Sequence, residues 1–179
     1  MPIAYRRLKR GDEEAYRRVH LESLKTFPDN FGTLYEDQIK VQKLQFEEFI
    51  KTGTVGSFVF GAFADNELIG IAGFKRGDRP KTQHRGEIVH VFVNPDFQGQ
   101  KVGESLVREV IEAAFALPGV ESLELSAVAD NSSAQMLYEG FGFETYGIRR
   151  GYFKSGERYW DQRFMQLFKE RYLRYGKSS

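Results

Sequence analysis

The turn Asp96–Gly103 carries the clearest potential for chemistry, because it joins a glycine-bearing loop to the start of a helix. The first backbone N–H groups of a helix lack partners within the helix, and the helix dipole adds partial positive charge there. Such a site favours an anion, phosphate above all. Gly99 and Gly103 would let a bulky ligand approach the backbone closely. The residues alone leave two interpretations open: a phosphate-binding turn, or an ordinary connection with two turn glycines.

A buried strand and a long helix must position this turn. Most of Glu87–Val93 is apolar, as expected of a strand covered on both faces. Asn94 and Pro95 end the strand, since proline cannot extend a central ladder. The apolar residues after the turn share one helical face. They are Val102, Leu106, Val110, Ala113 and Leu117.

Apolar patterns and turn residues predict further elements on both sides of this unit. Those before it are a strand over Ile3–Leu8, helices from about Asp12 to Thr26 and over Tyr35–Lys51, and a hairpin of Ser57–Ala64 with Leu68–Lys75. Those after it are a strand over Ser122–Ala129, a short helix through Glu139, strands over Phe141–Arg149 and Tyr159–Phe168, and a hairpin-type turn over Gly151–Arg158. Interleaved helices and strands imply an α/β or α+β sheet covered by helices.

The composition bounds the class of protein. The chain of 179 residues predicts a single domain, placed at 1–168, and a basic tail over Lys169–Ser179 that is expected to fray. The formal net charge of +1 gives no reason to expect nucleic acid or an anionic membrane as a partner. Without cysteine the chain cannot form a disulfide, a thiolate zinc site or a cysteine nucleophile, and we expect no metal. Since no signal peptide or membrane span is evident, we expect a soluble, cytoplasmic protein.

Two motifs resemble those of the GCN5-related N-acetyltransferase (GNAT) family. Val93-x-Pro95-x-x-Gln98-Gly99-x-x-x-Gly103 resembles the family's acyl-CoA signature Gln/Arg-x-x-Gly-x-Gly/Ala, with Lys101 in place of the middle glycine. Asn131-x-x-Ala134-x-x-Leu137-Tyr138-x-x-x-Gly142-Phe143 is similar to the family's N-x-x-A-x-x-L-Y-x-x-x-G-F. At Lys101 the backbone is either helical, where the lysine could add charge near a pyrophosphate, or the loop is distorted. Two motifs in the right order are more specific than either alone.

The resemblance implies a fold and a cofactor site. The family fold is a mixed, mostly antiparallel sheet of six or seven strands, flanked by about four helices and open between the fourth and fifth strands. In the implied site, main-chain amides bind the diphosphate of acetyl-CoA, Asn131 contacts the pantetheine arm and Tyr138 contacts the sulfur. Without the resemblance, Asn131 reads as a helix N-cap and Tyr138 as a packed aromatic. The implied cofactor-binding residues are Val91, Phe92, Val93, Gln98, Gly99, Gln100, Lys101, Val102, Gly103, Glu104, Asn131, Ala134 and Tyr138.

The chemistry implied is attack of a neutral amine on a thioester. Glu87 is the preferred base, directly or through water, and His90 is the alternative. Each also has a plain interpretation, Glu87 as a solvated acid and His90 as a packed strand residue. Because they are three residues apart, a regular strand sends them to opposite faces unless a bulge lies between them. Tyr138 is expected to donate a hydrogen bond to the departing sulfur, since full proton transfer to a thiolate is uphill by about 2 kcal/mol unless its pKa is lowered.

The acceptor pocket is expected between the first two helices and the last hairpin. Each candidate residue there could instead serve only in packing or on the surface. Aromatic residues with acids would hold a cationic amine, whereas aromatic residues with arginines would hold a carboxylate-bearing amino acid. The candidates are Phe27, Phe31, Leu34, Tyr35, Glu36, Asp37, Arg149, Arg150, Tyr152 and Tyr159.

The combined prediction is an acyl-CoA-dependent N-acetyltransferase that transfers acetyl directly to a primary amine of a small molecule or amino acid. A protein N-terminus or lysine is the alternative acceptor. A CoA-binding sensor or interaction module without catalysis is the alternative from another class. Dimers are common in the family, although nothing in this sequence fixes a homodimer.

Overall fold

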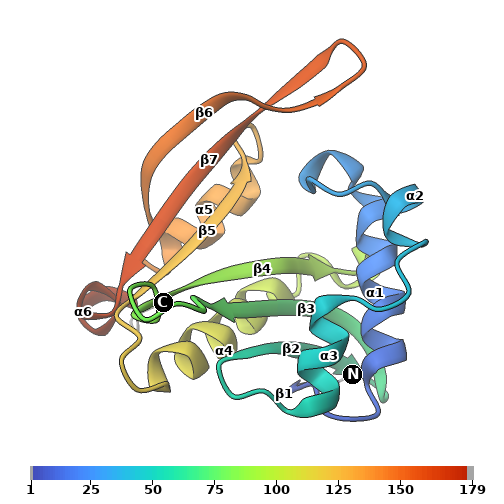
Figure 1. Ribbon diagram of the computed structural model, residues 1–179, viewed down its shortest axis with the longest axis horizontal. Coiled ribbons are helices and arrows are strands. Elements are labelled where there is room, and N and C mark those ends of the chain that lie inside the picture. The colour runs from blue at the N-terminus through green and yellow to red at the C-terminus, as the bar shows by residue number, and fades with distance from the viewer. Residues whose placement is uncertain (1, 177–179) are drawn as a thin grey trace.

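A seven-stranded sheet forms the centre of the molecule in the computed structural model, which describes residues 2–176 (Figure 1). The strands follow the order β1-β2-β3-β4-β5-β7-β6, and every neighbouring pair is antiparallel except β4 with β5. The predicted mixed, mostly antiparallel sheet is therefore confirmed. The strands are β1 Ile3–Arg7, β2 Ser57–Ala64, β3 Glu67–Arg76, β4 Arg85–Val93, β5 Ser122–Val128, β6 Glu144–Ser155 and β7 Arg158–Phe168.

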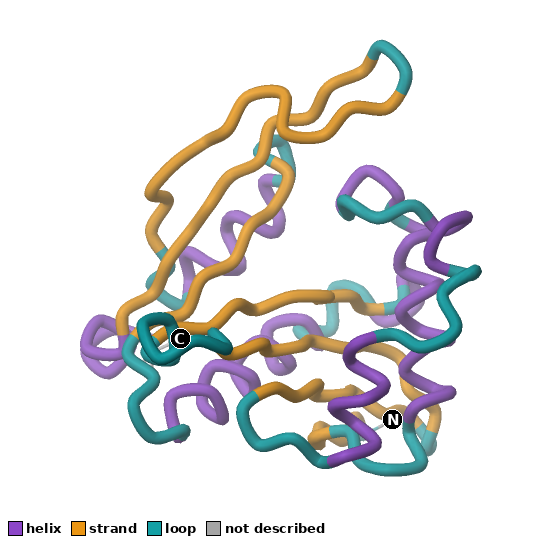
Figure 2. Tube along the Cα trace, viewed as in Figure 1, coloured by secondary structure: helices purple, strands orange, loops and turns teal. Residues whose placement is uncertain are grey.

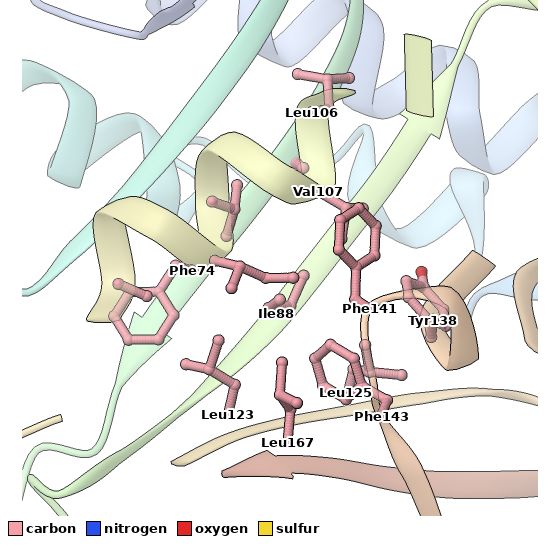
Figure 3. Close-up of a cluster of buried hydrophobic side chains, with 14 of the residues drawn as sticks. Phe74, Ile88, Leu106, Val107, Leu123, Leu125, Tyr138, Phe141, Phe143 and Leu167 are labelled. Carbon is pink, nitrogen blue, oxygen red and sulfur yellow. The ribbon is translucent and has the colours of Figure 1, made fainter. Parts of the chain in front are cut away.

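Helices cover both faces of this sheet. One hydrophobic cluster joins α1 and α3 to one face, and a second, part of which Figure 3 shows, joins α4 and α5 to the other and includes Leu106, Val107 and Ile88. β4 contributes to both clusters, with Ile88 on the α4 side and Phe92 on the α1 side. The helices are α1 Glu13–Thr26, α2 Tyr35–Gln38, α3 Gln45–Thr52, α4 Val102–Ala116, α5 Ser132–Gly140 and α6 Lys169–Arg171. Among residues 2–176, no helix has both the length and the apolar character needed to cross a membrane.

The single helix predicted over Tyr35–Lys51 is wrong, because the chain leaves the helix after α2 and re-enters it at α3 (Figure 2). Arg17 of α1 stabilises this break by donating to the carbonyls of Val41 and Gln42, at 3.0 Å each. The same guanidinium pairs with Glu47, whose carboxylate also accepts the backbone N–H of Leu44 at 2.6 Å. A tertiary contact thus overrides the local helix pattern.

A β-bulge interrupts β4 at His90. Val89 pairs with Gly73 and Phe92 pairs with Ile71, so Ala72 alone lies opposite both His90 and Val91. His90 has a φ of 56°, in the left-handed region that costs a non-glycine residue about 1–2 kcal/mol. The extra residue reverses the alternation of faces, so that Glu87 and His90 come to the same side of the sheet.

The sheet opens between β4 and β5. Their parallel pairing consists of three rungs, Arg85 with Ser122, Gly86 with Leu123 and Glu87 with Glu124. Beyond these rungs β5, β7 and β6 turn away from β1–β4, as Figure 1 shows. The predicted opening between the fourth and fifth strands is confirmed.

Two predictions for the C-terminal part are wrong. β6 runs to Ser155 and β7 begins at Arg158. Gly151, predicted to lie in the turn, therefore lies within an irregular strand, and its N–H donates to the side chain of Asp161 at 2.8 Å. The tail does not fray over residues 169–176. Lys169 and Arg171 donate to the carbonyls of Phe115 and Gly142, and Tyr172 is 2% exposed against the ring of Phe115. The last part of the predicted tail, residues 177–179, lies outside the described residues.

Gly86 in the second rung offers a test of this packing. A Cβ atom at Gly86 would collide with the buried ring of Phe74 and the carbonyl of Lys75, whereas one at Gly147 of β6 would meet no atom within 4 Å. We expect Gly86→Ala to lower the free energy of unfolding by about 1–3 kcal/mol, as overpacking does. Gly147→Ala is the matched control and should change it by less than about 1 kcal/mol. Urea denaturation measures both, and equal stability of the two variants would contradict the packing around Gly86.

Candidate active site

A cleft of about 580 Å³ lies where β4 and β5 diverge. β4 and β5 form its floor, α5 and the turn before α4 form one wall, and the segment after α1 together with the last hairpin forms the other. Both predicted motifs contribute to this one cavity. The predicted site residues that line it are Glu87, Val91, Phe92, Val93, Gln98, Gly103, Asn131, Ala134 and Tyr138.

The remaining predicted residues lie beside the cleft without lining it. Gly99, Gln100 and Lys101 are exposed at the turn, and Glu104 follows in the first turn of α4. Val102 is 1% exposed and packs in the core on the α4 side. Its side chain is therefore unavailable to a ligand, and only its main chain can face one.

The turn before α4 presents a row of backbone N–H groups. The first backbone hydrogen bond of α4 runs from Ser105 to the carbonyl of Lys101. Within the described chain, none of the amides from Gly99 to Glu104 donates to another residue. Gly99 has a φ of 76°, and alternation of right- and left-handed residues makes a concave group of N–H donors that suits an anion.

Lys101 takes a left-handed conformation, with φ 60° and ψ 19°. The interpretation that the backbone at Lys101 is helical in the ordinary right-handed sense is therefore wrong. A non-glycine residue in this region costs about 1–2 kcal/mol, so the turn keeps its shape against a local preference. The side chain of Lys101 is exposed, and its ammonium group adds positive charge to the same end of α4.

The edge of β4 that faces β5 is open beyond Glu87. No rung joins the two strands after Glu87 and Glu124, and residues Ile88–Val93 line the cleft. Backbone groups on this edge therefore face the cavity instead of a neighbouring strand. The bulge at His90 lies within this open part and re-aims the residues that follow it.

Asn131 and Tyr138 come from opposite ends of α5. The side-chain oxygen of Asn131 accepts the N–H of Ala134 at 3.1 Å, so Asn131 is the N-cap of the helix. Its amide NH₂ group is not used by this cap. The Tyr138 side chain is 7% exposed, and its ring packs edge-on to Phe143 with centroids 6.0 Å apart. Figure 3 shows its hydroxyl on the side turned away from Leu125 and Phe143.

Burial raises the pKa of Tyr138 to about 12. The phenol is therefore protonated throughout the neutral range and can donate a hydrogen bond. The shift is opposite to the lowered pKa that complete proton transfer to a thiolate would require.

His90 is a packed residue of the α1 side. Its Nδ1 lies 3.2 Å from the hydroxyl of Tyr16, and its ring contacts those of His20 and Phe46 with centroids 4.5 and 5.1 Å away. Burial and the neighbouring His20 lower the pKa of His90 to about 3. A group so weakly basic is a poor proton acceptor at neutral pH.

Glu87 is accessible from the cleft, although protein encloses part of its side chain. Partial burial raises the pKa of Glu87, and the carboxylate of Glu124 raises it further, while Lys75 and Arg85 lower it. An acid with a raised pKa is a stronger base in its ionised form. Of the two predicted bases, Glu87 therefore has the more suitable environment.

The acceptor side of the cleft is aromatic and carries little charge. Phe27 and Phe31 line it as predicted, and the ring of Phe153 covers Gly32. The other predicted acceptor residues do not line this cavity, including Arg149 and Arg150. Sequence reasoning missed Asn30, Gly32, Ser126, Ala127, Val128, Ser133, Phe153 and Gln162.

Gln162 shows why these residues were missed. It is 5% exposed, donates to Ser126 at 3.0 Å, and its side-chain oxygen has no partner among residues 2–176. Ser126 and Gln162 belong to neighbouring strands β5 and β7, and only the pairing of those strands brings them together. No local pattern marks either residue. Within the described part of the chain, no three His, Asp or Glu side chains are grouped so as to hold a metal ion.

Comparison with known proteins places these features in a family. The model of the acetyltransferase (GNAT) family matches residues 10–143, more than half of the chain. N-alpha-acetyltransferase RimI of Mycobacterium tuberculosis is 37% identical over 95 residues, which are 52% of this chain and 56% of that protein. The chain thus spans about half the length of this relative.

Solved structures share the fold over nearly the whole chain. The acetyltransferase of the GNAT family from Streptococcus pneumoniae has a TM-score of 0.78 at 22% identity, covering 93% of this chain and 99% of that one. The Salmonella typhimurium protein yncA, solved with its cofactor acetyl-CoA, has a TM-score of 0.76 at 18% identity, covering 94% of both chains. Together with the family match, the fold and the cleft lead to one conclusion: the chain belongs to the acetyltransferase (GNAT) family.

Proposed function

We propose that the protein transfers an acetyl group from acetyl-CoA directly to a primary amine. The observation that carries the proposal is the meeting of three features in one cleft: the turn with free amides, the open edge of β4 and the phenol of Tyr138. Family membership and the acetyl-CoA bound by yncA support the choice of co-substrate.

The chain offers binding groups for three parts of acetyl-CoA: the diphosphate, the pantetheine arm and the thioester carbonyl. The amides of Gly99–Glu104 would bind the diphosphate at the N-terminus of α4. The NH₂ group of Asn131 would donate to the pantetheine arm, and Ala134 leaves room for it on α5. Backbone N–H groups along Val91–Val93 would polarise the thioester carbonyl, because the cleft keeps them free of a strand partner.

In the reaction, the amine nitrogen bonds to the thioester carbon, the carbon–sulfur bond breaks, and the products are an amide and a free thiol. Glu87 accepts one proton from the ammonium form of the substrate at its carboxylate, directly or through water. The second N–H proton lost from nitrogen ends on the sulfur. Tyr138 donates a hydrogen bond to the departing sulfur and keeps its own proton.

The acidity of Tyr138 decides this last assignment. With a pKa of about 12 against roughly 8.5 for a thiol, full transfer would be uphill by about 5 kcal/mol. A hydrogen bond from the neutral phenol stabilises the developing thiolate without that cost.

The charge of the cleft narrows the class of acceptor. Glu87 is the one carboxylate among the described lining residues, and no Lys or Arg is among them. Phe27, Phe31 and Phe153 can surround a cation. The acceptor is therefore a cationic amine without a carboxylate on the same carbon, and a free α-amino acid is disfavoured since its carboxylate would find no cationic partner.

A peptide N-terminus is the second candidate acceptor. Its first residue also carries an ammonium group without a free carboxylate beside it. The 37% identity with an N-alpha-acetyltransferase favours this candidate specifically.

Turnover of acetyl-CoA by an acceptor panel tests the function. We expect release of thiol with phenethylamine and with an alanine-initiated peptide, and a kcat/KM at least about 10-fold lower with phenylalanine because of its unpaired carboxylate. Thiol release in a coupled colour assay is the measurement. Binding of acetyl-CoA without turnover of any acceptor would instead indicate a CoA-binding module, and phenylalanine as the best substrate would contradict the acceptor class.

Gly103→Glu separates cofactor binding from folding. Gly103 lies in the first turn of α4, where an acidic side chain favours the helix, and its Cβ would lie 3.7 Å from Val93, an ordinary contact. We expect unchanged or slightly higher stability with CoA affinity lower on the order of 10-fold or more, because the added carboxylate repels the diphosphate at the free amides. Isothermal titration with CoA measures the affinity, and Gly103→Ala is the matched control, since the family signature accepts alanine at this position. Wild-type affinity in Gly103→Glu would place the diphosphate elsewhere.

Tyr138→Phe tests the hydrogen bond to sulfur. The ring keeps its packing against Phe143, so we expect kcat to fall roughly 10- to 1000-fold with the affinity for CoA changed little. Tyr172→Phe, which removes a buried hydroxyl remote from the cleft, should retain wild-type kcat. Single-turnover kinetics isolate the chemical step, and an unchanged rate for Tyr138→Phe would remove this residue from the mechanism.

A further inference from the structure

Two carboxylates face each other at the last rung before the sheet opens. Glu87 of β4 pairs directly with Glu124 of β5, so their side chains project from the same face of the sheet. On the other side of β4, Lys75 of β3 pairs with Glu87. The proposed base thus lies in a row between one cation and one anion.

Both nearby cations are engaged elsewhere. Arg85, two residues before Glu87 and on the same face, places Nη1 2.7 Å from Oε2 of Glu124. Lys75 donates to the side chain of Gln45 at 3.1 Å. Among residues 2–176, Glu87 itself makes no ion pair and no side-chain hydrogen bond.

Glu87 also lines three cavities, two of which concern the Arg85–Glu124 pair and the cleft. It lines the cleft, and it lines a second cavity of about 350 Å³ together with Arg85, Glu124 and the loop Gly77–Thr82. Glu87 thus borders both the cleft and the cavity that Arg85 and Glu124 line.

We infer that Glu124 and Arg85 are positioning residues whose ion pair holds Arg85 away from Glu87 and keeps Glu87 an unpaired proton acceptor. This inference rests on the proposed function. An Arg85 released from Glu124 would pair with Glu87, occupy its carboxylate and make it a weaker base.

Other titratable groups surround Glu87 and must be considered. Lys75 faces it from β3, His90 from β4 and Tyr146 from β6. Tyr16 and His20 of α1 lie behind His90, and Arg76, Asp78 and Arg79 lie around the second cavity. Arg85 and Glu124 are joined to each other, and because their charges are opposite, Glu124 raises the pKa of Glu87 while Arg85 lowers it.

Substitution of Glu124 and substitution of Arg85 should shift the pKa of Glu87 in opposite directions. Glu124→Gln removes the like charge and releases Arg85, so the pKa of Glu87 should fall. Arg85→Gln removes a cation and leaves Glu124 charged, so the pKa should rise. We expect the acid limb of the kcat/KM profile to move by about half a pH unit or more, to lower pH in Glu124→Gln and to higher pH in Arg85→Gln.

Two measurements test the roles of Arg85 and Glu124. The pH dependence of kcat/KM with the amine substrate gives the acid limb, and carbon-13 NMR titration of the Glu87 carboxyl, assigned with Glu87→Gln, gives the pKa without any need for activity. Glu121→Gln makes the same charge change at an exposed acid just before β5 and is the control. Circular dichroism checks folding, and Glu124→Gln alone carries the test if Arg85→Gln does not fold.

The outcomes separate the inference from the proposed function. Opposite shifts in both readouts, with no shift in Glu121→Gln, support the inference. Shifts of the same sign, or shifts no larger than those of the control, overturn it even when acetyl transfer is intact. Absence of acetyl transfer in the wild type would refute the proposed function, while the NMR midpoints would still decide whether Glu124 and Arg85 set the protonation of Glu87.

Discussion

The structure depends on one constraint: β4 has a strand on both sides over its first part and on one side over the rest. Before Ile88 the strand is paired on both sides, and after Glu87 only β3 remains beside it. Buried backbone groups without partners cost free energy, so the open edge must be satisfied by water or by a ligand. The cleft therefore exists because a ladder stops, and the two halves of the sheet carry the residues that surround whatever binds there.

Packing on the closed side keeps this open edge in shape. His90 holds an unfavourable left-handed conformation, and Tyr16, His20 and Phe46 surround its ring. Such strain persists where the surrounding structure fixes it. The same principle applies at Lys101, where the fixed ends of β4 and α4 leave a short turn to complete the connection.

The polarity of the cleft is uneven, and this bears on its chemistry. Its wall near α4 is a row of N–H donors, its centre holds a protonated phenol, and its acceptor side is aromatic with one carboxylate. One end of the cleft therefore suits an anionic group and the other a cationic one. Neutral His90 and paired Glu124 leave Glu87 as the group best placed to move a proton.

The sequence by itself determined the strand–turn–helix unit and the interleaving of helices and strands, because these follow from local patterns of apolar, glycine and proline residues over short stretches. The mixed sheet that opens between its fourth and fifth strands was implied by the resemblance of the two motifs to those of the GNAT family. Only the tertiary structure decided the break held by Arg17, the bulge at His90, the long hairpin that brings Phe153 to Gly32, and the pairing of Arg85 with Glu124. Each of these joins residues far apart in the chain, and their contact energies outweigh local preferences that are worth about 1 kcal/mol each.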